Sequence, residues 1–322
     1  MGEKLIDLHL HLDGSLSVAS VRKLAAMQEI ELPKDDGEIL KQLQVDDNCK
    51  SLEEYLQKFS YALSFLQTAE AVEESVYMLL EELRELGLVY TEIRFAPQLH
   101  KEKGLTQREV VQAAIRGRDR ASLRSNLILC CMRGADTHEE NLETVAVAGE
   151  YLYQGVCGVD LAGDEAHFPA ELYKEEFRLA KKLQIPITIH AGEADGPGSI
   201  WQALELGADR IGHGVRAIED ECLLAELAER KVALELCPTS NLDTHVYEKI
   251  EDYPIRRLLD AGVCVTINSD DMAVSGTNVK KELNLMKRVF NLSEKEVLEI
   301  KKNAVQSSFA DEKIKTYILE GL

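Results

Sequence analysis

The feature that most constrains the fold of this chain is a regular alternation of short apolar segments with longer amphipathic stretches. The short segments are rich in branched apolar residues, which is typical of buried strands. The stretches between them have helical periodicity, and Thr106 with Glu109 forms a capping-box pattern before one of them. Another ends at Gly87, a residue suited to a helix C-cap. The eight expected strands lie at 5–11, 88–96, 126–132, 157–162, 186–191, 209–213, 232–237 and 263–269.

Strands that alternate with helices predict a parallel sheet, and eight strands close an α/β barrel of the (β/α)8 TIM type. A doubly wound open sheet is the alternative, but no glycine-rich phosphate turn follows the first strand. Because no linker, low-complexity run or internal repeat divides the chain, we expect residues 1–322 to form one domain. The connection over about residues 14–87 is unusually long, so we expect several helices there, acting as a lid at the active-site end.

The charge of the chain limits its partners. Its 37 Lys and Arg face 57 Asp and Glu, which gives a formal net charge of −20. Such a charge repels nucleic-acid phosphates and anionic membranes, so we expect neither as a partner. No signal peptide and no run of about 18 apolar residues is visible, and the seven cysteines form no CxxC pair. We therefore expect a cytoplasmic protein with reduced thiols and a small-molecule partner, and the oligomeric state stays open.

The first expected strand separates apolar from polar side chains. Ile6, Leu8 and Leu10 point to one side of it. The other side carries the alternate residues, which are Asp7, His9, His11 and Asp13. A barrel interior ordinarily prefers branched apolar residues, so two imidazoles two residues apart on this face indicate that they converge on one ion.

Further polar side chains lie at the C-terminal ends of other expected strands. His190 ends the fifth strand and His213 the sixth, and the adjacent Asp270 and Asp271 follow the eighth. Barrel enzymes place their catalytic residues at this end of the strands. The other histidines fall in expected loops or turns, where we expect them at the surface, and they are His100, His138, His167 and His245.

Imidazoles together with a carboxylate suit a divalent ion of borderline hardness. Zinc is favoured, and iron, manganese and cobalt stay open on these residues alone. An ion of this kind with an open coordination position lowers the pKa of a bound water to about 7 and makes a nucleophile available at neutral pH. The residues therefore predict metal-assisted hydrolysis or hydrolytic deamination.

Six short motifs occur in one order along these strands. They are HLHLDGS, DLAGDE, HAGE, GHG, ELCPTSN and SDD. In this order and on these strands, they resemble the adenosine deaminase branch of the metal-dependent amidohydrolases, and the resemblance runs over about residues 5–290.

This resemblance implies one zinc ion per chain and a set of catalytic residues. The implied metal ligands are His9, His11, His190 and Asp270. Glu193 would donate a proton to purine N1. His213 would orient the attacking water and stabilise the negative charge that develops on its oxygen, and Asp270 would serve catalysis as well as metal binding.

The resemblance also implies how a purine nucleoside would be held. Asp271 would share a hydrogen bond with purine N7, which requires a proton on one of the two partners. The backbone N–H of Gly163 would meet N3, Asp13 would take the ribose hydroxyls, and His11 would also contact the substrate. The apolar gate of the family's lid helix is matched by Tyr55, Leu56 and Phe59.

Two of the implied roles have a clear physical reason. The amino group of an aromatic ring is a poor leaving group, so a general acid at the ring nitrogen must help to break the aromaticity. Glu193 must then be protonated at rest, and burial would raise its pKa as this requires. The Asp13 carboxylate accepts hydrogen bonds from a free 5′-hydroxyl but repels a 5′-phosphate, so a nucleoside is favoured over a nucleotide.

We therefore expect hydrolytic deamination of adenosine, and of 2′-deoxyadenosine, to inosine and ammonia through attack of a zinc-activated water on purine C6. Adenine and larger adenosine-containing metabolites such as aminofutalosine are the alternative substrates. The family's adenine deaminases usually have Glu at the place of Asp13, so Asp13 favours the nucleoside. The family usually has proline after the paired aspartates, and Met272 stands there, so the resemblance predicts no shape for this loop.

Other functional classes fit the sequence less well. Zinc deaminases of the other architecture need H-x-E with a later P-C-x-x-C, and this chain has HKE at 100–102 but no P-C-x-x-C. An amidohydrolase acting on an ester or amide would use the same ligands without an acid at Glu193. A catalytically silent relative would have lost a ligand or the acid, and none is missing.

Overall fold

The computed structural model describes residues 4–46, 49 and 52–322. Its strands run parallel to their neighbours in two four-stranded sheets, with the orders β1-β2-β3-β4 and β5-β6-β7-β8. The first sheet contains β1 (Leu5–His11), β2 (Leu88–Phe95), β3 (Ser125–Arg133) and β4 (Val156–Gly163). The second contains β5 (Thr188–Ala191), β6 (Arg210–His213), β7 (Ala233–Leu236) and β8 (Val265–Ile267).

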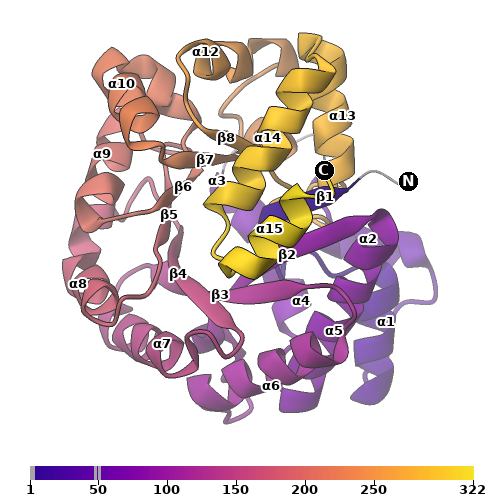
Figure 1. Ribbon diagram of the computed structural model, residues 1–322. Helices are drawn as coiled ribbons and strands as arrows, with labels where there is room; N and C mark the ends of the chain where they lie inside the picture. Colours follow the sequence, from indigo (N-terminus) through magenta and orange to yellow (C-terminus); the bar gives the residue numbers. More distant parts are fainter. Residues whose placement is uncertain (1–3, 47–48, 50–51) are drawn as a thin grey trace.

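Two sets of backbone contacts join the sheets into a closed barrel (Figure 1). At one seam, Val159 of β4 pairs with Ile187, which lies just before β5. At the other seam, the Asp270 N–H donates to the His9 carbonyl at 2.8 Å, and the His11 N–H donates to the Asp270 carbonyl at 2.9 Å. The prediction of an eight-stranded TIM-type barrel is confirmed, and β5 to β8 are shorter than the apolar segments suggested.

Helices surround the barrel on its outer side, as Figure 1 shows. Apolar residues of the strands and of the facing helices form one large core cluster between the two layers. The predicted capping box is present: Thr106 Oγ1 accepts from the Glu109 N–H at 3.3 Å, and the Glu109 carboxylate accepts from the Thr106 N–H at 2.9 Å. The helices of this ring include α6 (Gln107–Arg120), α7 (His138–Tyr151), α8 (Lys174–Lys182), α9 (Pro197–Leu206), α10 (Glu221–Arg230), α12 (Ile255–Asp260) and α13 (Val279–Phe290), whereas the short α11 (Pro238–Asp243) lies at the end of the barrel where Ser240 lines a cavity.

The long connection between β1 and β2 contains helices, as predicted. In its described part they are α1 (Val18–Met27), α2 (Asp36–Leu43), α3 (Leu52–Leu56), α4 (Phe59–Leu63) and α5 (Ala69–Leu86). Helix α5 begins at Thr68, whose hydroxyl accepts from the Ala71 N–H at 3.2 Å. It ends at Gly87, whose φ of 100° lies in the left-handed region, so the predicted C-cap is confirmed.

Different helices cover the two ends of the barrel. In Figure 1, α15 (Glu312–Leu319) lies in front of the barrel and α3 lies behind it. On the α15 side, Ile6 and Leu8 pack in an apolar cluster with Val305 of α14 (Glu294–Ser307) and Ile318 of α15. Residues of α3 instead share a cavity with residues from the C-terminal ends of the strands.

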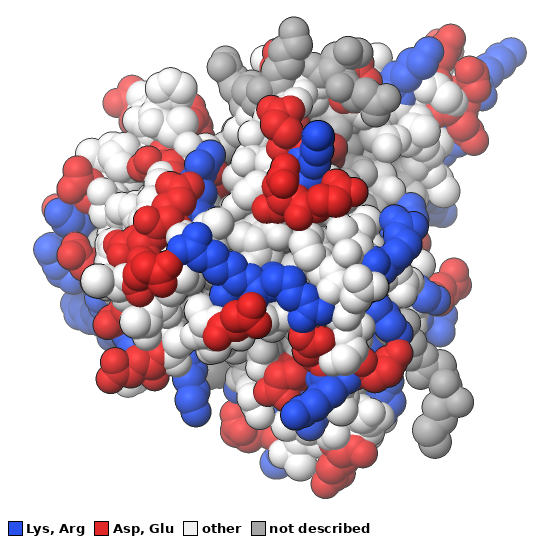
Figure 2. Space-filling view, turned by 90° about the horizontal axis from the view of Figure 1, so that it is seen from above, with Lys and Arg blue, Asp and Glu red and all other residues white. Residues whose placement is uncertain are grey.

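The surface carries charges of both signs. Figure 2 shows one face, on which Lys and Arg side chains lie beside Asp and Glu side chains. Ion pairs such as Arg257–Glu221 and Lys287–Glu294 join neighbouring helices. None of the helices in the described part of the chain is both long and apolar enough to cross a membrane.

A layer of buried charges lies inside the barrel. The Arg94 guanidinium of β2 donates to Asp160 of β4 and to Glu235 of β7, both at 2.8 Å, and also to the Leu8 carbonyl at 2.7 Å. Arg94, Asp160 and Glu235 are all fully buried. A buried charge is tolerated only when it is paired and hydrogen-bonded, so each of these groups depends on the others.

A second guanidinium extends this layer. Arg210 of β6 pairs with Glu235 at 2.6 Å and with Glu92 of β2 at 2.7 Å. No role was predicted for these residues, although Glu92 and Arg94 alternate along β2 as His9 and His11 do along β1. The same period-two pattern would have placed them inside the barrel.

Replacing Arg94 by Met removes the cation that Asp160 and Glu235 share. Breaking a buried ion pair costs about 3–5 kcal/mol, so we expect the free energy of unfolding to fall by that amount in a denaturant titration of the metal-free protein. Arg108, which pairs with Glu150 at the surface, is the control, and Arg108→Met should change the free energy by less than about 1 kcal/mol. Equal effects of the two substitutions would contradict a structural role for the buried layer.

Candidate active site

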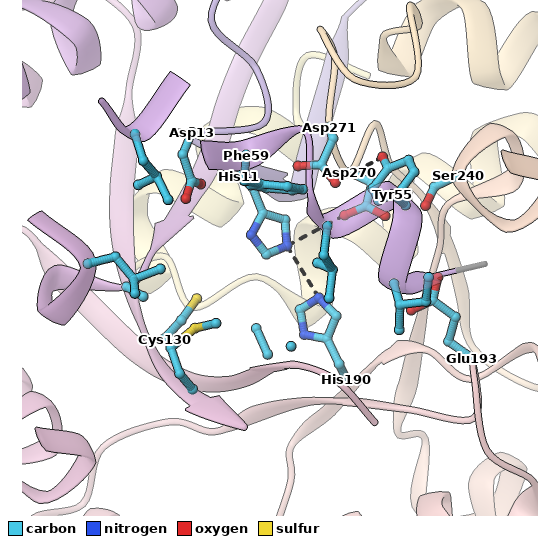
Figure 3. A pocket seen from close by; sticks show the side chains of 18 of the residues that line it. His11, Asp13, Tyr55, Phe59, Cys130, His190, Glu193, Ser240, Asp270 and Asp271 are labelled. Atoms are coloured by element: carbon cyan, nitrogen blue, oxygen red, sulfur yellow. Dashed lines mark hydrogen bonds and ion pairs between the residues drawn. The ribbon is translucent and has the colours of Figure 1, made fainter. Parts of the chain in front are cut away.

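The polar residues predicted at the strand ends converge at one end of the barrel. His11 Nε2 lies 3.2 Å from His190 Nε2 and 3.5 Å from Asp270 Oδ1, as the dashed lines in Figure 3 show. His9 Nε2 lies 3.2 Å from the same Asp270 oxygen, and His213 Nε2 lies 3.7 Å from Asp270 Oδ2. One ligand atom from each of His9, His190, His213 and Asp270 falls within 4.8 Å of the others, so this group could hold a metal ion.

Buried carboxylates orient two of these rings. His9 Nδ1 lies 2.8 Å from Glu235, and His190 Nδ1 lies 3.0 Å from Asp160. A carboxylate only accepts hydrogen bonds, so in its neutral form each ring carries its proton on Nδ1 and points the lone pair of Nε2 into the site. His9 Nε2 is buried and has no hydrogen-bond partner among the described residues. These nitrogens and the Asp270 carboxylate form a donor set that fits a divalent cation such as zinc.

Two of the converging residues have an unusual backbone conformation. His213 has a φ of 59° and Asp270 a φ of 61°, both in the left-handed region that residues other than glycine rarely adopt. His213 is the last residue of β6, and Asp270 lies three residues beyond the end of β8; at both places a change of direction turns the side chain into the site. Strained conformations of this kind persist where the surrounding structure holds them, and they cluster at functional sites.

Glu193 is buried beside this cluster. Its Oε2 lies 3.5 Å from His213 Nε2, and its Oε1 accepts from the Thr244 hydroxyl at 3.2 Å. Burial raises the pKa of Glu193 to about 8, and the nearby Asp270 and Glu165 carboxylates add to the shift. The side chain is therefore protonated at neutral pH, as a general acid requires. Burial also lowers the pKa of His213, to about 3, so its ring is neutral.

The loop that carries Glu193 is held by another buried carboxylate, Glu165. It accepts from the backbone N–H groups of Gly192, Glu193 and Ala194 at 2.6, 3.0 and 2.7 Å. A carboxylate that accepts several backbone hydrogen bonds fixes the path of the loop. No role was predicted for Glu165, although it is the last residue of the DLAGDE motif.

A cavity of about 200 Å³ opens beside these residues. Asp13, Gly163 and Asp271 contribute polar groups to its lining, together with the catalytic and metal-binding candidates His11, His190, Glu193, His213 and Asp270 (Figure 3). Apolar side chains such as Leu99 and Met132 complete the wall. A mostly apolar cleft with a few convergent polar groups is the usual form of a small-molecule site.

Residues of the long connection line the same cavity. Tyr55 and Leu56 come from α3 and Phe59 from α4, so the three predicted gate residues face the cavity. The Tyr55 hydroxyl is buried and donates to Asp271 Oδ2 at 3.0 Å. Asp271 Oδ1 is buried and has no hydrogen-bond partner among the described residues. It is therefore available to a bound molecule.

Burial raises the pKa of Asp271 and Asp13, which line the cavity. The pKa of Asp271 lies well above its usual range because the group is buried and because the Asp270 and Asp13 carboxylates are close. Burial raises the pKa of Asp13 to about 6, so Asp13 is mostly ionised at neutral pH. The two carboxyl groups can therefore play different roles, one as donor and the other as acceptor.

The loop after β8 explains the methionine that replaces the family's usual proline. The Met272 N–H donates to the Ser15 hydroxyl at 3.1 Å, and proline has no N–H to make this bond. Of the other histidines, His138, His167 and His245 are exposed as predicted. The prediction for His100 was wrong: it ends a short 3-10 helix, Pro97–His100, it is fully buried, and its Nδ1 lies 3.0 Å from the Leu66 carbonyl.

Comparison with known proteins agrees over nearly the whole chain. The sequence profile of the family described as adenosine deaminase matches residues 5–322. The adenosine deaminase of Haemophilus ducreyi is 44% identical over 324 residues, which cover 98% of this chain and 94% of that protein. The adenosine deaminase of Clostridium acetobutylicum is 39% identical over 323 residues, which cover 98% and 96%. The solved adenine deaminase of Arthrobacter aurescens has a TM-score of 0.87 at 26% identity and covers 98% of this chain and 97% of that one. This chain therefore belongs to the adenosine deaminase family.

Proposed function

We propose that this protein hydrolyses adenosine, and 2′-deoxyadenosine, to the corresponding inosine and ammonia. The proposal rests mainly on Glu193, which is buried, has a raised pKa and lies at the wall of a small-molecule cavity. Beside it, a cluster of imidazoles and Asp270 could hold a metal ion. The relatives from Haemophilus ducreyi and Clostridium acetobutylicum, both named adenosine deaminase, support the same reaction.

We propose one zinc ion per chain at the convergence of the strand ends. Its ligands would be His9, His11, His190 and Asp270. The buried carboxylates behind His9 and His190 support this set, because they leave the Nε2 lone pairs free to coordinate. When bound, such an ion lowers the pKa of a water molecule to about 7 and so supplies a nucleophile at neutral pH.

Glu193 would act as the general acid at purine N1. Protonating N1 while C6 is attacked removes the negative charge that would otherwise build up on the ring, so the aromatic system is broken at a lower barrier. A raised pKa and a position at the cavity wall both support this role. His213, a neutral ring 3.5 Å from Glu193, would orient the attacking oxygen and stabilise its charge.

The polar groups of the cavity would hold the nucleoside. The free Oδ1 of Asp271 and the raised pKa of this group support a hydrogen bond from the protonated carboxyl to purine N7. The Gly163 N–H would meet N3, and Asp13 would accept hydrogen bonds from the ribose hydroxyls. Helices α3 and α4 would form the lid, with Tyr55, Leu56 and Phe59 as its inner face.

The cell compartment and the partners of this protein stay predictions. We infer a cytoplasmic protein because Cys130, Cys131, Cys157 and Cys237 are free thiols buried in the core, as reduced core thiols are. The net charge of −20 supports a small-molecule partner over nucleic acid or an anionic membrane. The oligomeric state stays open.

Removing the acid tests the chemistry. In Glu193→Gln the side chain keeps its size but cannot give up a proton, so we expect kcat for adenosine to fall by about 10²–10⁴-fold. Metal content should be unchanged, and Glu171→Gln, at an exposed position, should keep full activity. The measurement is steady-state kinetics beside elemental analysis. A nearly active Glu193→Gln variant would instead indicate an ester or amide hydrolase.

Removing a ligand tests the metal site. We expect His11→Ala to lose most of the bound metal after dialysis, because the variant lacks one of the ligand nitrogens at the centre of the cluster. His245→Ala, which removes an exposed imidazole, should keep the metal content of the parent. Elemental analysis of both variants decides, and full occupancy in His11→Ala would refute the assignment.

A substrate panel tests the reaction itself. Loss of the 6-amino chromophore should be fast with adenosine and 2′-deoxyadenosine, slow with adenine, and abolished by a chelator. A 5′-phosphate beside the buried Asp13 carboxylate should lower kcat/KM for AMP by at least about a hundredfold. In Asp13→Asn the ratio of kcat/KM for adenosine to kcat/KM for AMP should become smaller. Comparable rates for adenosine and AMP in the parent protein would overturn the nucleoside assignment, and a preference for adenine would favour an adenine deaminase.

A further inference from the structure

The histidines of the site differ in what faces their Nδ1 atoms. Behind His9 and His190 stand the carboxylates of Glu235 and Asp160. Behind His213, by contrast, stands an amide: its Nδ1 lies 3.1 Å from Nδ2 of Asn241, a fully buried residue of α11. A carboxylate can only accept a hydrogen bond, whereas an amide can donate or accept according to its orientation. The orientation of Asn241 therefore decides where the proton of His213 lies.

Tyr253 determines this orientation. Its hydroxyl is buried and lies 3.1 Å from Asn241 Oδ1, which is the hydrogen-bond partner found for it in the described part of the chain. A buried hydroxyl needs an acceptor for its proton, so the Asn241 oxygen faces Tyr253. The amide nitrogen must then face His213. With the amide turned over, the Tyr253 oxygen would accept from the amide N–H, but the hydroxyl proton would lose the acceptor found for it among the described residues, so the turned amide would be the costlier arrangement.

We propose that Asn241, held by Tyr253, is a positioning residue that keeps His213 in the tautomer with its proton on Nε2. This inference rests on the proposed function for its catalytic meaning. Because the Asn241 N–H donates to Nδ1, the neutral ring must carry its own proton on Nε2. That nitrogen lies 3.5 Å from Glu193 Oε2 and 3.7 Å from Asp270 Oδ2, so the N–H points into the site.

This tautomer gives His213 a different role from the neighbouring imidazoles. An Nε2 that carries a proton has no lone pair for a cation, so His213 is a hydrogen-bond donor although its nitrogen lies within the metal-binding group. In their neutral forms His9 and His190 have the opposite tautomer, because the carboxylates behind them require a proton on Nδ1, and so they keep their Nε2 lone pairs. His213 then stabilises negative charge on an oxygen between itself and Asp270, as an oxyanion donor does, and does not accept the proton of the water.

Nitrogen-15 NMR of the metal-free, full-length protein tests the tautomer directly. Histidine-labelled protein near neutral pH should show His213 with a protonated Nε2 and an unprotonated Nδ1. The signals of His213 are assigned by their absence from the spectrum of His213→Gln. A protonated Nδ1 in the parent protein would overturn the proposal, whatever the enzyme turns over.

Asn241→Asp replaces the N–H donor that faces His213 Nδ1 by a carboxylate acceptor in a side chain of the same size. The carboxylate requires a proton on Nδ1, so the His213 signals should move to the Nδ1–H form. We expect kcat to fall by about 10²–10³-fold, as for the loss of one oxyanion donor, with KM and metal content little changed. If Nδ1 of His213 is unprotonated in this variant, Asn241 does not determine the tautomer. If the proton moves to Nδ1 and kcat is unchanged, His213 does not act as a donor from Nε2.

Two further variants give the control and an independent test. Asn303→Asp alters a partly buried amide that donates to the Val265 carbonyl at 3.2 Å, at the start of β8, and should leave the His213 signals and kcat unchanged. Tyr253→Phe frees the Asn241 amide, so His213 should show a mixture of tautomers and a smaller loss of kcat. A tautomer as pure as in the parent would contradict the role of Tyr253. The NMR result is independent of turnover, so an inactive parent protein with Nε2–H would refute the proposed reaction and leave the tautomer assignment standing.

Discussion

The site depends on one buried guanidinium, Arg94, that two carboxylates share. Asp160 and Glu235 each accept from Arg94 on one side and meet an imidazole Nδ1 on the other. The cation holds the two carboxylates ionised inside the barrel, where burial alone would favour their neutral forms. Ionised carboxylates keep the protons of His9 and His190 on Nδ1. The same buried carboxylates and guanidinium therefore stabilise the barrel interior and prepare the site to bind a cation.

The parts of the fold and site that sequence reasoning predicted are those with a local signal. The alternation of His9 and His11 along one strand is a period-two pattern, and it gave the correct face of β1. The positions of His190 and His213 at strand ends followed from the segment boundaries. Because all strands of a parallel barrel end at the same rim, residues distant in sequence could be expected to meet there.

The parts that it did not predict depend on contacts between distant segments. Glu165 meets the loop at 192–195 across 27 or more residues, and Asn241 meets His213 across 28. Each residue is the last of a motif, DLAGDE or ELCPTSN, but a motif does not tell which distant segment its side chain contacts. His100 was misplaced because we expected a loop there, and loops usually lie at the surface, whereas His100 ends a 3-10 helix and meets the Leu66 carbonyl of the connection between β1 and β2. Contacts of this kind become visible only when the chain has folded.

Burial acts in opposite directions on the two groups that would move or hold protons. It raises the pKa of Glu193, because the charged form of an acid is the one that loses its hydration, and it lowers the pKa of His213 for the same reason. At neutral pH both groups are therefore uncharged, and each presents a proton into the cavity. Two neutral hydrogen-bond donors can stabilise negative charge that develops on the substrate, and neither group has to change its own protonation state beforehand. The closed barrel end, which excludes water from both groups, thus produces an acid and a hydrogen-bond donor from one physical cause.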